Sequence, residues 1–167
     1  MLLVAACGTR TGTTDEVISM GTLRITSTAF TNMKDIPSLY TCQGGDINPA
    51  LKIESIPPGT KSLALIMDDP DAPMGTWVHW VMWNIPRIDA IKEDSVPTGA
   101  VQGLNSWPKN SYGGPCPPSG PHRYFFKLYA LNTTLDLPGN AGKQDLEKAM
   151  QGHILDKAEL IGLYRKR

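Results

Sequence analysis

Runs of apolar and β-branched residues, separated by connections rich in proline and glycine, predict a framework of β-strands. Some runs alternate apolar and polar positions, as half-buried strands do, and others are almost wholly apolar, as buried strands are. The strand-like segments are 22–27, 51–56 and the runs that begin near Ser62, Trp77, Arg123 and Ala158. The pattern therefore predicts a mostly β domain.

Two further segments complete the predicted framework. Residues 143–150 carry apolar positions at helical spacing and are followed by Gly152, a common stop signal, so one helix is predicted there. Segment 87–103 is polar and weakly patterned, and we expect a long surface loop with some local helix or turn. No internal repeat or low-complexity tract interrupts this pattern.

An acidic segment, Asp-Asp-Pro-Asp-Ala-Pro at 68–73, follows the apolar run that begins at Ser62. Its prolines lack an N–H group and fix their own φ, so they end the strand and stiffen the residues between them. Because residues two apart point the same way in extended backbone, Asp69 and Asp71 are predicted to face one cavity, with Asp68 directed elsewhere. A solvated turn is the alternative interpretation, since Asp and Pro favour turns for local reasons.

The run from Trp77 to Asn84 contains one polar exception, a histidine among apolar neighbours. Counting by twos predicts one face of this strand made of Trp77, His79, Val81 and Trp83. A lone histidine on an apolar face is more often a hydrogen-bonded core residue than a ligand group. For this strand in isolation, the core interpretation is favoured.

A second histidine follows a loop of glycine and proline at 113–121, which delivers it to the start of a strand predicted from about Arg123 to Leu131. Alternation groups His122 with Tyr124 on one face, so an imidazole and a phenol project together. Glycines in the loop can expose backbone N–H groups to an anion, and prolines lower the entropy lost on binding. The alternative is a rigid connection at one end of a sheet.

Three motifs occur in a fixed order in this chain. They are Asp-Asp-Pro-Asp-Ala-Pro at 68–73, Trp-Val-His-Trp at 77–80, and Gly-Pro-Cys-Pro-Pro at 114–118 followed by His-Arg-Tyr at 122–124. The set resembles the phosphatidylethanolamine-binding protein family, which includes the Raf kinase inhibitor proteins, and in particular its small bacterial and archaeal branch. The resemblance implies a mostly β fold of two packed, largely antiparallel sheets with one or two short helices.

The resemblance also implies a small pocket for phosphate-like or carboxylate-like anions. Carried over position by position, the ligand-binding residues would be Asp69, Asp71, His79, Gly114, Pro118, His122 and Tyr124. In this scheme His122, Tyr124 and loop amides donate to a phosphoryl oxygen. Asp69 or Asp71 holds His79 in one tautomer and binds the cationic part of a zwitterionic head group. Many eukaryotic members carry a second histidine where this chain has Val78.

The predicted function is a non-catalytic binding protein for a small anion, a phospholipid head group or a phosphorylated partner, with a regulatory role. The first alternative is an inhibitor of a kinase or protease that acts through its surface. The second is a metal-dependent hydrolase that uses the Asp and His residues above as ligands or as an acid and a base. The chain has no Gly-x-Ser-x-Gly elbow, Gly-Lys-Ser/Thr loop or His-Glu-x-x-His motif, so an enzyme is not favoured. No cofactor or metal is expected.

Composition limits the remaining partners. The chain has 167 residues, and 16 basic residues balance 16 acidic ones, so the formal net charge is zero. This balance gives no extended basic face, and no nucleic-acid partner is expected. The length suits a single domain, predicted at 20–167, that can bury a sizeable core without disulfides. A homodimer is left open.

The first residues allow two interpretations. Leu-Val-Ala-Ala-Cys at 3–7 ends like the lipobox of a bacterial lipoprotein, which makes Cys7 a candidate for lipidation, with 8–19 as a tether. In that case residues 1–19 are a leader remnant and tether, and the protein is anchored to a membrane outside the cytoplasm. Against this, the apolar stretch is short and no basic residue precedes it. The alternative is a mis-called start, with the natural start near Met20 and a cytoplasmic protein.

The cysteines do not form a recognisable metal motif. Cys7, Cys42 and Cys116 make an odd count and lack the short paired spacings of a zinc site. We therefore expect free, buried thiols, with pairing of Cys42 and Cys116 as the alternative.

Overall fold

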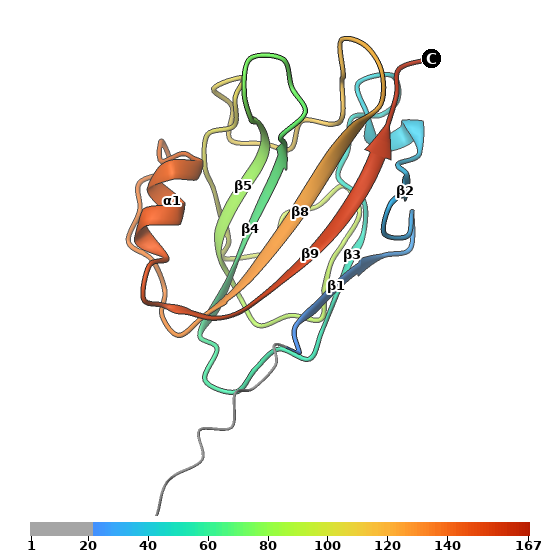
Figure 1. The fold of residues 1–167 in the computed structure, drawn as a ribbon. Helices are drawn as coiled ribbons and strands as arrows, with labels where there is room; N and C mark the ends of the chain where they lie inside the picture. Colours follow the sequence, from blue (N-terminus) through green and yellow to red (C-terminus); the bar gives the residue numbers. More distant parts are fainter. Residues whose placement is uncertain (1–21) are drawn as a thin grey trace, which may run out of the picture.

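The computed structural model describes residues 22–167, which contain nine strands, one α-helix and one short 3-10 helix (Figure 1). In chain order these are β1 (Arg24–Ser27), β2 (Lys34–Asp35), η1 (Ser38–Tyr40), β3 (Leu51–Glu54), β4 (Ser62–Asp69), β5 (Trp77–Ile85), β6 (Ala90–Ile91), β7 (Val101–Gln102), β8 (His122–Leu131), α1 (Lys143–Ala149) and β9 (Ile154–Tyr164). The predictions for 1–19, including lipidation of Cys7, lie outside the described residues. Within 22–167, no helix has the length and apolar character needed to cross a bilayer.

The strands form two sheets. The larger has the order β2-β9-β8-β4-β5-β7, and the smaller has the order β1-β3-β6. All pairs are antiparallel except β2 with β9. The small sheet covers one face of the large sheet and α1 covers the other (Figure 1). The predicted fold of two packed, largely antiparallel sheets with one or two short helices is thus confirmed.

Strand β4 lies at the centre of the large sheet, between β5 and β8. All eight of its residues are buried because both sheet faces are covered. Leu65 and Met67 pack toward the small sheet, whereas Ala64 and Ile66 pack toward α1. The continuous apolar run in the sequence is therefore the pattern of a two-sided core strand.

Strand β8 follows the simple alternation that its sequence predicts. Tyr124, Phe126 and Leu128 lie in the core between the two sheets, and Tyr129 packs on the opposite face. Its pairing with β4 is regular along its length, so the period of two is preserved.

Strand β5 contains an irregularity that changes its faces. Met67 pairs with Trp80, and the next β4 residue, Asp68, pairs with Val78. His79 is therefore the additional residue of a β-bulge. Bulges of this kind redirect side chains and are frequent beside functional sites.

The bulge makes the predicted face of β5 wrong. Val81 and Trp83 pack toward α1, whereas the His79 ring lies 5.2 Å from the ring of Tyr124, which belongs to the core between the sheets. Trp80 faces that same core. The predicted set of Trp77, His79, Val81 and Trp83 therefore does not share one face, because counting by twos fails across an inserted residue.

The predictions for segments 143–150 and 87–103 can also be compared with the structure. The helix predicted at 143–150 is α1, whose first turn is fixed by the Gly142 N–H donating to an Asp145 oxygen at 3.0 Å. The segment 87–103, predicted as a loop with some local helix or turn, contains turns at 93–94 and 98–99 and no helix. It also forms the short strands β6 and β7, which pair with β3 and β5. Strands of two residues are too short to show alternation in the sequence.

The expectation of free, buried thiols is also wrong. Cys42 and Cys116 form a disulfide between the loop after η1 and the loop before β8. Cys42 is exposed to solvent and Cys116 is half-buried. The two residues are 74 positions apart, and only the folded chain brings their loops together.

Trp83→Ala tests the core beneath α1. The Trp83 side chain is fully buried, so its removal should lower the free energy of unfolding by about 3–5 kcal/mol. Urea unfolding followed by far-UV circular dichroism measures this loss. The matched control is Trp107→Ala, which removes a ring of the same size that is 38% exposed, and its loss should be less than half as large. Equal losses for the two variants would contradict this description of the core.

Candidate functional site

A hollow of about 410 Å³ opens between the turn after β4, the start of β5 and the loop before β8. Its walls are mainly proline, tryptophan and Met74, and its polar members are Asp69 and His79. Of the seven predicted ligand-binding residues, three line this hollow directly: Asp69, His79 and Pro118. The other four lie behind its walls or beside it.

Two hydrogen bonds join His79 to Gly113. The imidazole Nδ1 lies 2.6 Å from the Gly113 carbonyl oxygen, and the Gly113 N–H donates to the His79 carbonyl oxygen at 3.0 Å. Because a carbonyl only accepts, Nδ1 carries the proton and Nε2 keeps its lone pair when the ring is neutral. The strand bulge and the loop before β8 are thus locked together at the site.

Burial controls the charge of His79, which is only 2% exposed. Burial lowers the pKa of His79 below its usual value, and the opposing effects of the Gly113 carbonyl and the Asp69 charge are smaller. The imidazole is therefore neutral at pH 7. The prediction that Asp69 or Asp71 holds its tautomer is wrong, since the Gly113 carbonyl does so.

Asp69 is instead the partner of the other predicted histidine. Its Oδ2 accepts from His122 Nδ1 at 2.7 Å, and its Oδ1 accepts from the Asp71 N–H at 2.8 Å. Both members of the Asp69–His122 pair are buried. One carboxylate therefore orients an imidazole and also fixes the acidic turn.

Asp71 does not share the hollow with Asp69, so that prediction is wrong. The chain leaves the extended conformation at Pro70, where β4 gives way to a turn, and counting by twos no longer applies. The Asp71 carboxylate binds the Arg123 guanidinium, with Nε at 2.9 Å and Nη2 at 2.7 Å. This pairing lowers the pKa of Asp71 to about 2. Asp71 and His122 line a neighbouring surface hollow on the Arg123 side.

Asp68 is directed away from the site, as the sequence predicts. Its carboxylate is fully buried on the α1 side and forms ion pairs with Lys127 and Lys143. Asp68 is thus part of the scaffold under α1.

Tyr124 lies behind the wall of the hollow, next to His79, and its side chain is fully buried. Its ring lies edge-on to His79. Its buried hydroxyl oxygen is near the Cys116 backbone and the Asp69 carboxylate, but it has no partner within hydrogen-bond distance among residues 22–167. Burial raises the pKa of Tyr124 far above its usual value, and the nearby charge of Asp69 adds to this effect. The hydroxyl is therefore protonated and able to donate.

Gly114 has a structural role where the loop before β8 meets the loop after η1. Its N–H donates to Asp46 Oδ1 at 2.6 Å, so this amide is directed into the loop after η1. A Cβ atom at this position would lie 2.5 Å from the Tyr40 carbonyl oxygen and 2.8 Å from Thr41 Cα. Glycine is required here because two backbones approach closely.

The sequence did not reveal Trp107. Its ring lies edge-on to His79 at 5.2 Å and to Trp77 at 5.3 Å, and it forms one wall of the hollow. Met74, which is 97% exposed, lies at the rim. An aromatic residue in an otherwise polar loop was the available signal, but loops have no periodicity that would show its direction.

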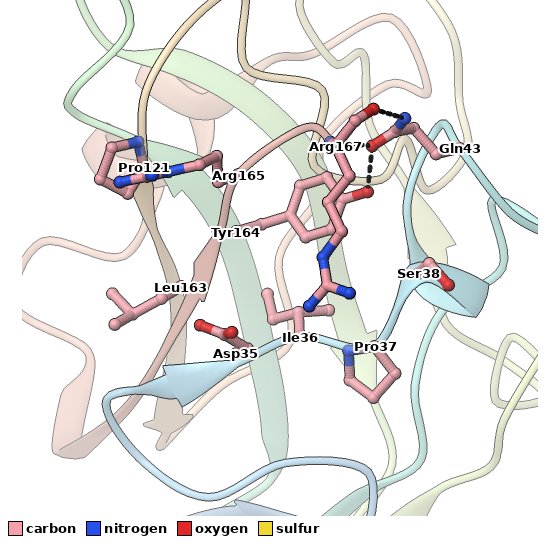
Figure 2. Close-up of a pocket in the computed structure, with 10 residues that line it drawn as sticks. All are labelled: Asp35, Ile36, Pro37, Ser38, Gln43, Pro121, Leu163, Tyr164, Arg165 and Arg167. Atoms are coloured by element: carbon pink, nitrogen blue, oxygen red, sulfur yellow. Dashed lines mark hydrogen bonds between the residues drawn. The ribbon is translucent and has the colours of Figure 1, made fainter.

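A larger hollow, of about 880 Å³, lies beside β2 and the end of β9 (Figure 2). It is lined in part by Arg165, Arg167 and Asp35, and by none of the predicted ligand-binding residues. The Gln43 side chain fixes this region, because it donates to the Arg167 carbonyl oxygen and accepts from the Tyr164 hydroxyl (Figure 2). We place the candidate site in the smaller hollow because only that one combines a buried imidazole, a buried carboxylate and an adjacent unpartnered hydroxyl.

The chemistry of the site follows from these groups. Neutral His79 offers an acceptor at Nε2, and Tyr124 offers a donor. A ligand that carries both an acceptor oxygen and a transferable proton, such as hydrogen phosphate, satisfies both. Within the part of the chain that the structure describes, no three His, Cys, Asp or Glu side chains gather as they would around a metal ion.

Comparisons with known proteins show the family of the chain. The family described as phosphatidylethanolamine-binding protein matches residues 26–165. A UPF0098 protein of Methanothermobacter thermautotrophicus is 53% identical over 144 residues, which cover 83% of this chain and 95% of the relative. A UPF0098 protein of Pyrococcus horikoshii is 49% identical over 150 residues, covering 84% and 76%.

Two solved structures share the fold. The crystal structure of a phosphatidylethanolamine-binding protein homologue, CT736 of Chlamydia trachomatis, superposes with a TM-score of 0.85 at 40% identity, covering 89% of this chain and all of that one. YbcL of E. coli superposes with a TM-score of 0.82 at 31% identity, covering 87% and 99%. The chain belongs to the phosphatidylethanolamine-binding protein family, in its small microbial branch.

Proposed function

We propose that this binding protein takes up a phosphomonoester, such as the head group phosphoethanolamine, in the hollow lined by His79. The observation that carries the proposal is the buried hydroxyl of Tyr124, which lies beside a neutral imidazole and has no hydrogen-bond partner in the described part of the chain. A buried polar group without a partner destabilises a protein by about 1–3 kcal/mol. A phosphoryl oxygen that accepts from this hydroxyl removes that penalty.

The charge of the site defines the protonation state of the bound ligand. Each oxygen of Asp69 already accepts one hydrogen bond, from His122 or from the Asp71 N–H, and Asp69 places negative charge close to His79. A phosphoryl dianion beside Asp69 is therefore stable only if one proton lies between the ligand and His79 Nε2. The proton comes either with the ligand, as a P–OH group, or from solvent, as an imidazolium.

The apolar walls are suited to the remainder of the head group. Trp77 and Trp107 present ring faces and edges at one side of the hollow, and Asp69 contributes negative charge. An alkylammonium group gains from both features, because cations are attracted to aromatic rings and to carboxylates. The proposed activity is binding without turnover.

Binding of phosphoethanolamine should depend on pH. The pKa of His79 is lowered in the free protein, and a bound anion raises it, so the complex holds one more proton than the separated partners. Affinity should therefore fall by about tenfold per pH unit above about pH 7. Isothermal titration calorimetry across this range measures the slope, and buffers of different ionisation enthalpy measure the proton uptake directly. Affinity that does not change with pH would contradict the proposed protonation.

Tyr124→Phe isolates the contribution of one hydroxyl. Because no residue of 22–167 lies within hydrogen-bond distance of this hydroxyl, its loss should leave the free energy of unfolding unchanged or slightly raised. Phosphoethanolamine affinity should fall by about tenfold, the value of one hydrogen bond to a charged group.

The matched control for this variant is Tyr112→Phe. The Tyr112 hydroxyl donates to the Tyr40 carbonyl oxygen at 2.7 Å and does not line the hollow. Its removal should lower stability by about 1 kcal/mol and leave affinity within about twofold of the wild type. Wild-type affinity in Tyr124→Phe would remove the main support for the proposed site.

A further inference from the structure

The disulfide between Cys42 and Cys116 forms part of the wall of the candidate site. Cys116, Pro117 and Pro118 line the hollow, so the sulfur bridge is attached directly to the segment that closes one side. Cys42, on the other side of the bridge, is exposed to solvent. The bridge therefore joins a residue exposed to solvent to a residue that lines the pocket.

The wall segment has few other restraints. Outside the sheets and the helix, no backbone–backbone hydrogen bond among residues 22–167 involves the segment 116–121. Three of these six residues are prolines, which have no N–H to donate. The last backbone hydrogen bond before the segment is the one from the Cys42 N–H to the Pro115 carbonyl oxygen at 3.2 Å. Pro117 is held by packing, since it is buried, and the disulfide is the covalent attachment of this wall to the loop after η1.

The opposite loop is held independently of the disulfide. Gln43, the neighbour of Cys42, bonds the Tyr164 hydroxyl and both the N–H and the carbonyl of Arg167 (Figure 2). Asp46 accepts from the Gly114 N–H. When the disulfide opens, the loop that carries Cys42 therefore keeps its position. The wall segment 116–121 is the part that gains conformational freedom.

The groups that bind the phosphoryl oxygen lie outside the wall segment 116–121. His79 is fixed by Gly113, which precedes the last backbone hydrogen bond, and Tyr124 is a core residue of β8. Opening the disulfide should therefore leave the binding groups in place and disorder only the wall that excludes water from them. Exclusion of water strengthens the polar contacts of the ligand. If the wall is closed for only a fraction of the time, the apparent affinity is reduced by that fraction.

We propose that Cys42–Cys116 is a reversible thiol–disulfide exchange site that controls ligand affinity in the adjacent hollow. This inference depends on the proposed function. The oxidised protein binds the phosphomonoester tightly, and the reduced protein, with the same fold, binds it more weakly. The reacting partner is a dithiol reductant, either a small molecule or a protein with two neighbouring cysteines.

The exchange is a balanced two-electron reaction. A thiolate of the reductant attacks the Sγ of Cys42, the more exposed of the two residues. This forms a mixed disulfide and releases Cys116 as a thiolate that takes up a proton. The second thiolate of the reductant attacks the mixed disulfide and releases Cys42, which also takes up a proton. The protein gains two electrons and two protons, and the dithiol becomes a cyclic or intramolecular disulfide.

The experiment compares the two redox states of one protein. All variants carry Cys7→Ser, so that two thiols at most can form per chain. Phosphoethanolamine affinity is measured by calorimetry for the air-oxidised protein, for the protein reduced with dithiothreitol, and for the protein re-oxidised after removal of the reductant. Thiol titration counts the free thiols, and circular dichroism shows whether each state keeps its fold.

We expect two thiols per chain after reduction, an unchanged circular dichroism spectrum, an affinity about tenfold lower, and recovery on re-oxidation. The control is the double variant Cys42→Ser with Cys116→Ser, which should show the lower affinity and no response to dithiothreitol. In the oxidised protein, the double variant Pro117→Gly with Pro118→Gly should also lower phosphoethanolamine affinity, because the glycines make the wall more flexible while the disulfide stays closed.

Each contrary result has a distinct meaning. Equal affinities in the oxidised and reduced states would overturn the exchange site and leave the proposed function intact. Loss of the native spectrum on reduction, or failure of dithiothreitol to open the bond, would overturn it also, because the disulfide is then purely structural. Absence of binding in the oxidised protein would overturn the proposed function itself.

Discussion

The pair of hydrogen bonds between His79 and Gly113 is the interaction on which the site depends. It fixes the bulged residue of β5 to the loop before β8, and it is possible because the bulge turns His79 out of the regular alternation of its strand. A Cβ atom on Gly113 would lie 2.6 Å from the Trp107 ring, so the close packing of loop and aromatic wall requires glycine at this position. The same contact selects the imidazole tautomer, and so it sets what the hollow can accept or donate.

The site is poor in positive charge for a place that is proposed to receive an anion. The guanidinium of Arg123 neutralises Asp71 at the surface, and the buried Asp69 is shared between His122 and the acidic turn. Recognition must therefore come from directed hydrogen bonds in a desolvated hollow together with one shared proton, rather than from long-range attraction. Such a site distinguishes ligands by their protonation and shape, which suits a small phosphomonoester bound without chemistry. The absence of strong attraction also makes the completeness of the wall important, and the wall is where the disulfide is attached.

The sequence predicted those parts of the fold in which local pattern and tertiary structure agree. Strand β8 keeps its period of two from His122 onward, so the shared direction of His122 and Tyr124 could be derived by counting. The position of His79 could not, because a bulge is determined by the pairing partner and leaves no mark in a single strand. Asp71 was misplaced for a related reason, since the turn begins one residue before it. The pairing of Cys116 depends on two distant loops meeting, which no spacing in the sequence encodes.

The position of a bound phosphomonoester tests this account most directly. In a crystal structure of the oxidised protein with phosphoethanolamine, the phosphoryl group should lie within hydrogen-bond distance of both His79 Nε2 and the Tyr124 hydroxyl. A phosphoryl group found instead between Arg165 and Arg167 in the larger hollow, with the Tyr124 hydroxyl still unpartnered, would contradict it.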